Sequence, residues 1–103
     1  VLIICTNVHI IQLMEFEWDP KKARANATKH GVRFSDATFV LDDDSAVTVL
    51  DVYPFEERYV TIGRDSMGRV LVVIYAWRGH AIRIISARKA IRYEQTRYLK
   101  SRP

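Results

Sequence analysis

The segment Arg69–Trp77 constrains the fold of this chain more than any other. It reads RVLVVIYAW, so every position after the first is apolar or aromatic. Because successive side chains of a strand point to opposite faces of a sheet, such a run predicts a central strand covered on both sides. Gly68 and Gly79, on either side of the run, favour tight turns. The rest of the chain must therefore supply neighbouring strands and covering helices.

Four other segments are expected to pair in the same sheet. Their polar and apolar residues alternate, as in a strand with one buried face: Glu15–Trp18, Ala46–Asp51, Arg58–Arg64 and His80–Ile85. The last two segments adjoin the apolar run through short turns. Strands joined in this way predict an antiparallel meander.

Two helices are expected after the first strand. Asp19 and Pro20 favour a helix start, because aspartate accepts hydrogen bonds from the first turn and proline there loses none. Gly31 favours its end after His30. Ser35 is expected to cap a second helix of about one turn. The acidic run that follows, at 42–44, is expected to form a solvated turn.

A third helix is expected at the C-terminal end. Ser86 is a suitable capping residue for a helix from Ala87 to about Lys100, which would put Arg88 in its first turn. The predicted fold class is therefore α+β: an antiparallel β-sheet meander with two N-terminal helices and one C-terminal helix.

The length of 103 residues predicts a single domain. Residues 1–13 are apolar but too few to cross a bilayer. We expect them to be a non-native or upstream extension of a domain spanning 14–103, with an extra edge strand as the alternative. A single cysteine, Cys5, excludes an internal disulfide. His9, His30 and His80 lack the spacing of metal ligands, so we expect no metal and no cofactor.

Charge is distributed unevenly along the chain. From Val1 to Glu57 there are 5 Lys and Arg against 10 Asp and Glu, whereas from Arg58 to Pro103 there are 11 against 2. Nine of those 11 cations are arginine, whose planar guanidinium donates paired hydrogen bonds to phosphate. The C-terminal half therefore predicts a surface for a nucleic-acid backbone, with an ordinary solvated surface as the alternative.

Several motifs in order resemble the BrnT family. They are FEWDP at 16–20, KHGV at 29–32 and RIISAR at 83–88, together with Phe34, Glu57-Arg58, Gly63, Gly68-Arg69 and Tyr98. Each motif alone is weak, but their order and spacing together are specific. The resemblance covers nearly the whole chain, from Met14 to Tyr98.

The resemblance implies a toxin of a type II toxin–antitoxin system with a RelE-like fold. Such a protein would be a cytoplasmic endoribonuclease that cuts RNA without a metal and slows translation and growth. Its partner would be a BrnA-like antitoxin with a ribbon-helix-helix domain, in a 2:2 complex that binds operator DNA. No membrane association is implied.

RNA cleavage by the ribose 2′-OH requires a base, cations around the phosphoryl oxygens and an acid for the leaving oxygen. Arg58, Arg83 and Arg88 are the candidate cations, with ion pairs to Glu56, Glu57 or Glu94 as the alternative. His30 and Glu57 are the candidate bases, although His30 also suits a helix C-terminus. We expect further RNA contacts from four residues: Lys29, Arg78, Lys89 and Tyr93. A non-catalytic module that binds nucleic acid or antitoxin remains the competing prediction.

Overall fold

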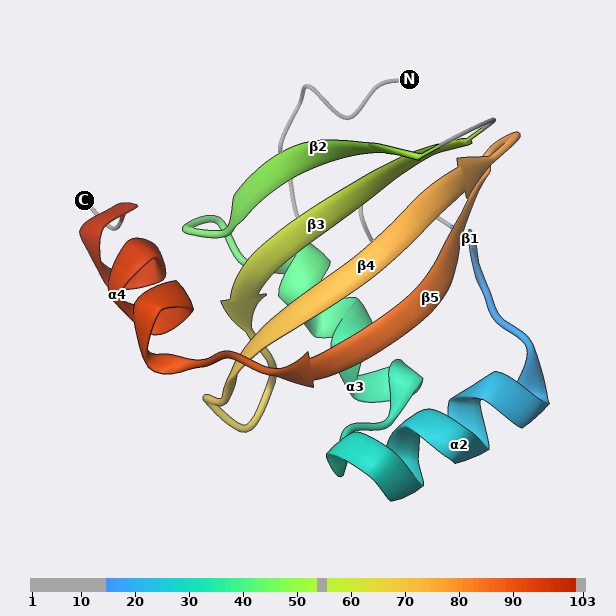
Figure 1. Cartoon of the computed structure of the whole chain (residues 1–103), viewed down its shortest axis with the longest axis horizontal. Coiled ribbons are helices and arrows are strands. Elements are labelled where there is room, and N and C mark those ends of the chain that lie inside the picture. Colours follow the sequence, from blue (N-terminus) through green and yellow to red (C-terminus); the bar gives the residue numbers. More distant parts are fainter. Residues whose placement is uncertain (1–14, 54–55, 102–103) are drawn as a thin grey trace.

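Five strands form one mixed sheet in the order β1-β5-β4-β3-β2 in this computed structural model (Figure 1), which describes residues 15–53 and 56–101. The strands are β1 (Glu15–Glu17), β2 (Val47–Tyr53), β3 (Glu56–Arg64), β4 (Val70–Arg78) and β5 (Ala81–Lys89). Strands β2 to β5 form the predicted antiparallel meander, and β1 adds to β5 in parallel. The central position of β4 confirms the prediction from the apolar run.

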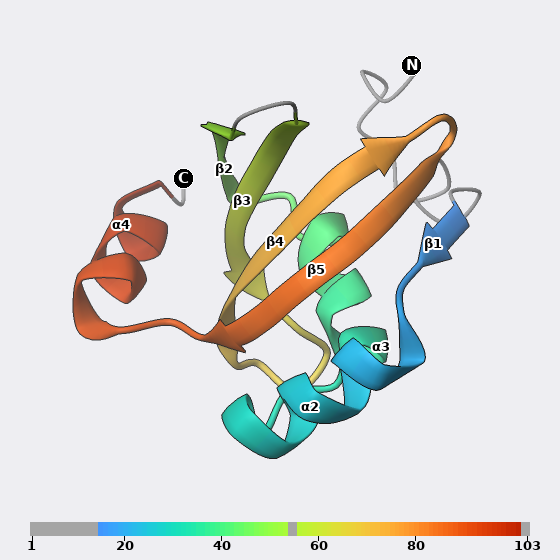
Figure 2. The same cartoon turned by 45° about the vertical axis from the view of Figure 1, so that its right-hand side comes forward.

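The helices are α2 (Pro20–His30), α3 (Phe34–Ala37) and α4 (Arg92–Ser101), and the 3-10 helix η2 (Thr38–Asp42) continues α3. Figure 2 shows α3 behind β4 and β5, α2 below the strands and α4 on the left. Helix α2 has the expected ends, because the Asp19 side chain accepts a hydrogen bond from the Lys21 amide and Gly31 adopts the left-handed conformation with φ 70°. The predicted α+β class is confirmed, and residues 1–13 lie outside the described part.

Two predicted helix starts are wrong. Helix α3 begins at Phe34 with Arg33 at the N-cap position, so Ser35 is inside the helix rather than before it. Ser86 lies within β5, and α4 begins only at Arg92. The physical reason is that β4 is nine residues long, and its first half needs a hydrogen-bonded partner. Residues Ala87–Lys89 supply that partner by pairing with Leu71–Val73.

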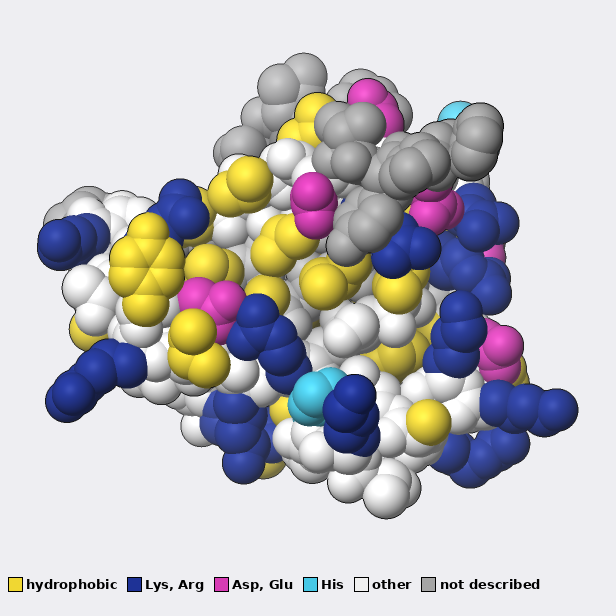
Figure 3. Space-filling model, viewed as in Figure 1, with side chains coloured by type: hydrophobic (Ala, Val, Ile, Leu, Met, Phe, Trp, Pro, Cys, Tyr) yellow, Lys and Arg dark blue, Asp and Glu magenta, His cyan; other side chains and the backbone are white. Residues whose placement is uncertain are grey.

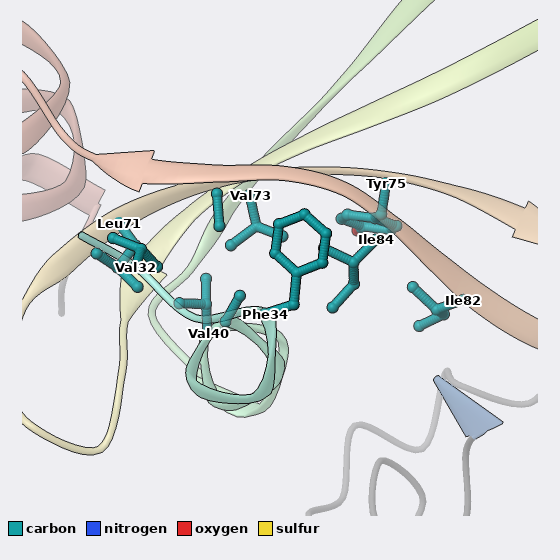
Figure 4. Packing of buried hydrophobic residues seen from close by; sticks show 10 residues of the cluster. Val32, Phe34, Val40, Leu71, Val73, Tyr75, Ile82 and Ile84 are labelled. Atoms are coloured by element: carbon teal, nitrogen blue, oxygen red, sulfur yellow. The ribbon is translucent and has the colours of Figure 1, made fainter. Parts of the chain in front are cut away.

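The main core lies between the sheet and the α2–α3 layer. Phe34 is 2% exposed and lies against β4 and β5 (Figure 4), among Val73, Tyr75 and Ile84. A smaller cluster on the other side of the sheet packs Tyr98 of α4 against β3 and β4. Among residues 15–53 and 56–101, helix α4 is the helix that packs on that side, and it covers only one end of it. We call this side the open face.

Candidate functional site

The open face of the sheet is the one turned away from α2 and α3. Side chains of β3, β4 and β5 alternate between the two faces, so those next to core residues such as Tyr75 and Ile84 belong to the open face. Four of the predicted cations lie there: Arg58, Arg78, Arg83 and Arg88. Figure 3 shows this face, with apolar side chains over its middle and basic and acidic side chains intermingled on its right-hand part.

Two of these arginines flank one small residue. Arg83 pairs with Ala76 across β5 and β4, and the pairing of Tyr59 with Tyr75 brings Arg58 opposite Ala76 from the other side. We call Arg58, Ala76 and Arg83 the arginine row. Since adjacent strands lie about 4.8 Å apart, the backbones of the two arginines are roughly 10 Å apart. Both side chains leave the same face of the sheet, one on each side of Ala76.

Each arginine of the row forms an ion pair with a neighbouring carboxylate. Arg83 Nη1 lies 2.8 Å from Glu17 Oε2 on β1. Arg58 Nε donates to Glu56 Oε2 at 3.0 Å, and Arg78 Nη2 lies 3.6 Å from the other oxygen of the same carboxylate. The side chains of Arg58 and Arg83 are each 31% exposed, so both stay accessible to solvent. These ion pairs orient the side chains of Arg58 and Arg83 and leave both partly exposed.

Arg88 has a different environment from the one predicted for it. It is a strand residue of β5, not a residue of the first helical turn, and it pairs with Val72 under α4. Its guanidinium donates two hydrogen bonds of 2.8 Å to Glu94, which also accepts from the Ile91 amide. These hydrogen bonds raise the pKa of Arg88 and lower the pKa of Glu94, against a smaller opposing effect of burial. Arg88 therefore anchors α4 to the sheet.

The two candidate bases lie away from the arginine row. Glu57 is exposed, and the alternation along β3 turns it to the same side as Tyr59, which packs against the main core. His30 and Lys29 form the last turn of α2. Lys89 is exposed and shares the α2 side of the sheet with Leu71, its partner on β4. The predicted site residues are thus divided between the open face and the opposite side of the sheet, where α2 also lies.

Tyr93 lies beside a shallow groove between α4 and the β2–β3 pair. Its side chain is 67% exposed. The groove has a volume of about 260 Å³, and its lining includes Val49, Val60 and Arg97. An exposed ring at this place can stack on a base, as the sequence suggested.

Three residues that hold the site together were not found from the sequence. Glu17 lies in the FEWDP motif, but its role as the partner of Arg83 depends on the parallel pairing of β1 with β5. Asn26 is buried within α2 and hydrogen-bonds Ala87 of β5. Asp43 accepts hydrogen bonds from the Arg64 amide and the Tyr98 hydroxyl, so this acidic run is more than a solvated turn. A polar residue on the buried side of a helix was the available signal for Asn26.

Within residues 15–53 and 56–101, no group of three or more histidine, cysteine or acidic side chains is placed to hold a metal ion. Among the same residues, no helix is both long and apolar enough to span a membrane.

Comparisons with known proteins point to one family. Residues 18–94 match the family model described as the ribonuclease toxin BrnT of type II toxin–antitoxin systems. Among solved structures, the chain is similar to the ribonuclease toxin BrnT of Brucella abortus, with 30% sequence identity and a TM-score of 0.60. That match covers 77% of this chain and 99% of the Brucella chain. A comparison with curated proteins gives no significant match.

Proposed function

Because this chain belongs to the BrnT family of ribonuclease toxins of type II toxin–antitoxin systems, we propose that it is an endoribonuclease whose arginine row binds the phosphate to be cleaved. The observation that carries this assignment is that Arg58 and Arg83, from two non-adjacent strands, flank Ala76 on the same face of the sheet. The small alanine side chain leaves room for a phosphate group between the two guanidinium groups.

The proposed reaction is attack by a ribose 2′-OH on the adjacent phosphorus. Charge then accumulates on the phosphoryl oxygens, and fixed cations that meet those oxygens stabilise the transition state. Arg58 and Arg83 supply these cations without a metal. Arg78 and Tyr93 would bind the flanking nucleotides on the open face. Lys29, His30 and Lys89 would meet the RNA strand where it passes the end of α2, and Arg88 would support this surface by fixing α4.

The assignment is tested by RNA cleavage in EDTA with Arg83→Ala. Loss of one fixed cation should lower kcat by about 100-fold or more. The control is Arg33→Ala, which removes the same charge from a side chain that is 73% exposed at the start of α3. If Arg83→Ala binds and cleaves RNA like the unchanged protein, the arginine row is not the site. If RNA is bound but stays intact in every case, the protein is a binding module.

We propose further that cleavage slows translation and growth and that an antitoxin covers the arginine row at rest. The supporting observation is that carboxylates already pair with each arginine of the row, so acidic side chains of a partner suit the same positions. A ribbon-helix-helix antitoxin, a 2:2 complex and operator binding are expected from the family. Mass measurement of the co-purified complex, and cleavage assays with the antitoxin added, test these points.

A further inference from the structure

The proposed reaction needs a base, and neither predicted base faces the arginine row. Glu57 points to the other side of β3. His30 lies one helical turn after Asn26, which hydrogen-bonds Ala87. Ala87 is four residues from Arg83 along β5, which corresponds to roughly 13 Å. A base must come within hydrogen-bond reach of the 2′-OH that it deprotonates, so both residues are badly placed.

Four of the carboxylates on the open face differ in which oxygens are engaged. Both oxygens of Glu94 accept hydrogen bonds from Arg88, and one accepts from Ile91 as well. Asp51 pairs with Arg58 across β2 and β3 at the rim of the α4 groove. Glu17 lies on the three-residue strand β1 and contacts Arg83. Glu56 is the carboxylate that two arginines from two strands contact.

From this arrangement we infer that Glu56 is the general base of the proposed ribonuclease, a role that rests on the proposed function. Its Oε2 atom accepts the hydrogen bond from Arg58 Nε. Its Oε1 atom lies 3.6 Å from Arg78 Nη2, which is beyond hydrogen-bonding distance, and no other described residue donates to it. Oε1 therefore has acceptor capacity for the 2′-OH proton, while Arg58 binds both this carboxylate and the neighbouring phosphate.

The 2′-OH proton moves to Glu56 Oε1, the 2′-oxygen forms a bond to phosphorus, and the bond from phosphorus to the 5′-oxygen breaks. The leaving 5′-oxygen takes a proton from water. The products are a 2′,3′-cyclic phosphate and a free 5′-hydroxyl. Titratable and charged groups around Glu56 are Arg58 and Glu57 on its own strand, Arg78 on β4 and Asp51 on β2, and Glu57 lines the same pocket as Glu56 and Arg78.

The test is the pH profile of kcat for the full chain acting on a short RNA in EDTA. Glu56→Gln keeps an oxygen for the Arg58 hydrogen bond but cannot take the proton. We expect kcat to fall about 100- to 10,000-fold and the decline of the rate at acidic pH to disappear. The affinity for the same RNA with 2′-deoxyribose at the cut site should change less than about threefold, which excludes mere misplacement of the arginines.

Three rival variants and one control decide the result. Glu57→Gln tests the base predicted from the sequence, and Glu17→Gln and Asp51→Asn test the neighbouring carboxylates. The control is Asp44→Asn, an exposed turn residue behind the sheet, which should keep the normal profile. The inference is overturned if Glu56→Gln keeps its acidic decline, or if a rival variant alone loses it. Failure of the unchanged protein to cleave RNA would instead reject the proposed function.

Discussion

Asn26 shows how one residue joins two parts of the molecule. Strand β1 pairs with β5 only from Ala81 to Arg83, so the outer edge of β5 needs another partner beyond that point. The Asn26 side chain supplies it: Nδ2 donates to Ala87 O at 2.7 Å, and the Ala87 amide donates to Oδ1 at 3.2 Å. Nδ2 also donates to Val32 O at 3.0 Å, which fixes the chain after α2. An amide, with both donor and acceptor, is the side chain that this edge requires.

Replacing Asn26 by alanine should therefore destabilise the protein. The buried groups of Ala87 and Val32 lose their partner, which costs about 1–3 kcal/mol, although alanine itself favours the helix. Urea denaturation should show a lower midpoint with an unchanged slope. Thr28→Ala, on the exposed side of the same helix, is the control. A midpoint equal to that of the control would mean that Asn26 does not hold β5.

Helix α4 is the element whose attachment depends most on ionised groups. Glu94 binds Arg88, and Asp43 accepts from the Tyr98 hydroxyl. Burial raises the pKa of Asp43, but hydrogen bonds from the Arg64 amide, Tyr98 and the Ser45 amide outweigh this and lower it. Both carboxylates therefore stabilise the folded state above their unfolded pKa values, and this stability is lost as the pH falls through their folded values.

Acid should release α4 before the rest of the sheet unfolds. As the pH falls below about 4.5, where an unfolded glutamate titrates, amide hydrogen exchange in residues 92–101 should accelerate first. Glu94→Gln should already show this at pH 7 and lose about 1 kcal/mol, which corresponds to roughly 4–8 °C in Tm. Glu15→Gln, at an exposed position of β1, is the control. Equal exchange in α4 for both variants would refute the proposed anchor.

At the scale of the whole molecule, the uneven distribution of charge along the sequence corresponds to a difference between the two sides of the sheet. The arginines of β3, β4 and β5 share the open face, while α2 and α3 pack against the other side of the sheet. The net charge is only +4, so overall charge alone gives little attraction for RNA. Affinity should therefore depend on which cation is removed rather than on how many.

Salt dependence of RNA binding measures this directly. For single strands, the logarithm of the affinity falls with the logarithm of salt concentration by about 0.7 per neutralised phosphate. Arg58→Ala and Arg83→Ala should each reduce the slope by about that amount. Arg33→Ala, with the same change in net charge but on the helix side, should leave it unchanged. Equal reductions in all three variants would favour a diffuse effect of charge over a defined site.

Local chemistry was enough to predict several elements from the sequence. Asp19, Pro20 and Gly31 determine the ends of α2, because each satisfies or avoids a local backbone requirement. The apolar run predicted β4 at the centre, because burial on both faces leaves no other position for it. Short turns between consecutive strands predicted the meander. The arginines expected at the site were likewise predicted from charge and motif alone.

Only the tertiary structure decided which of these residues meet. Ser86 suits a helix cap locally, but the hydrogen-bonding demand of β4 keeps residues 86–89 in the strand and turns Arg88 toward Glu94. Glu56 and Glu57 are chemically identical, and the alternation of β3 alone puts one beside Arg58 and the other on the opposite side. The sequence by itself determined the elements and the surplus of arginine, because both depend on neighbouring residues. Long-range pairing determined the arginine row, because Arg58, Ala76 and Arg83 are distant in the chain and adjacent only in the sheet.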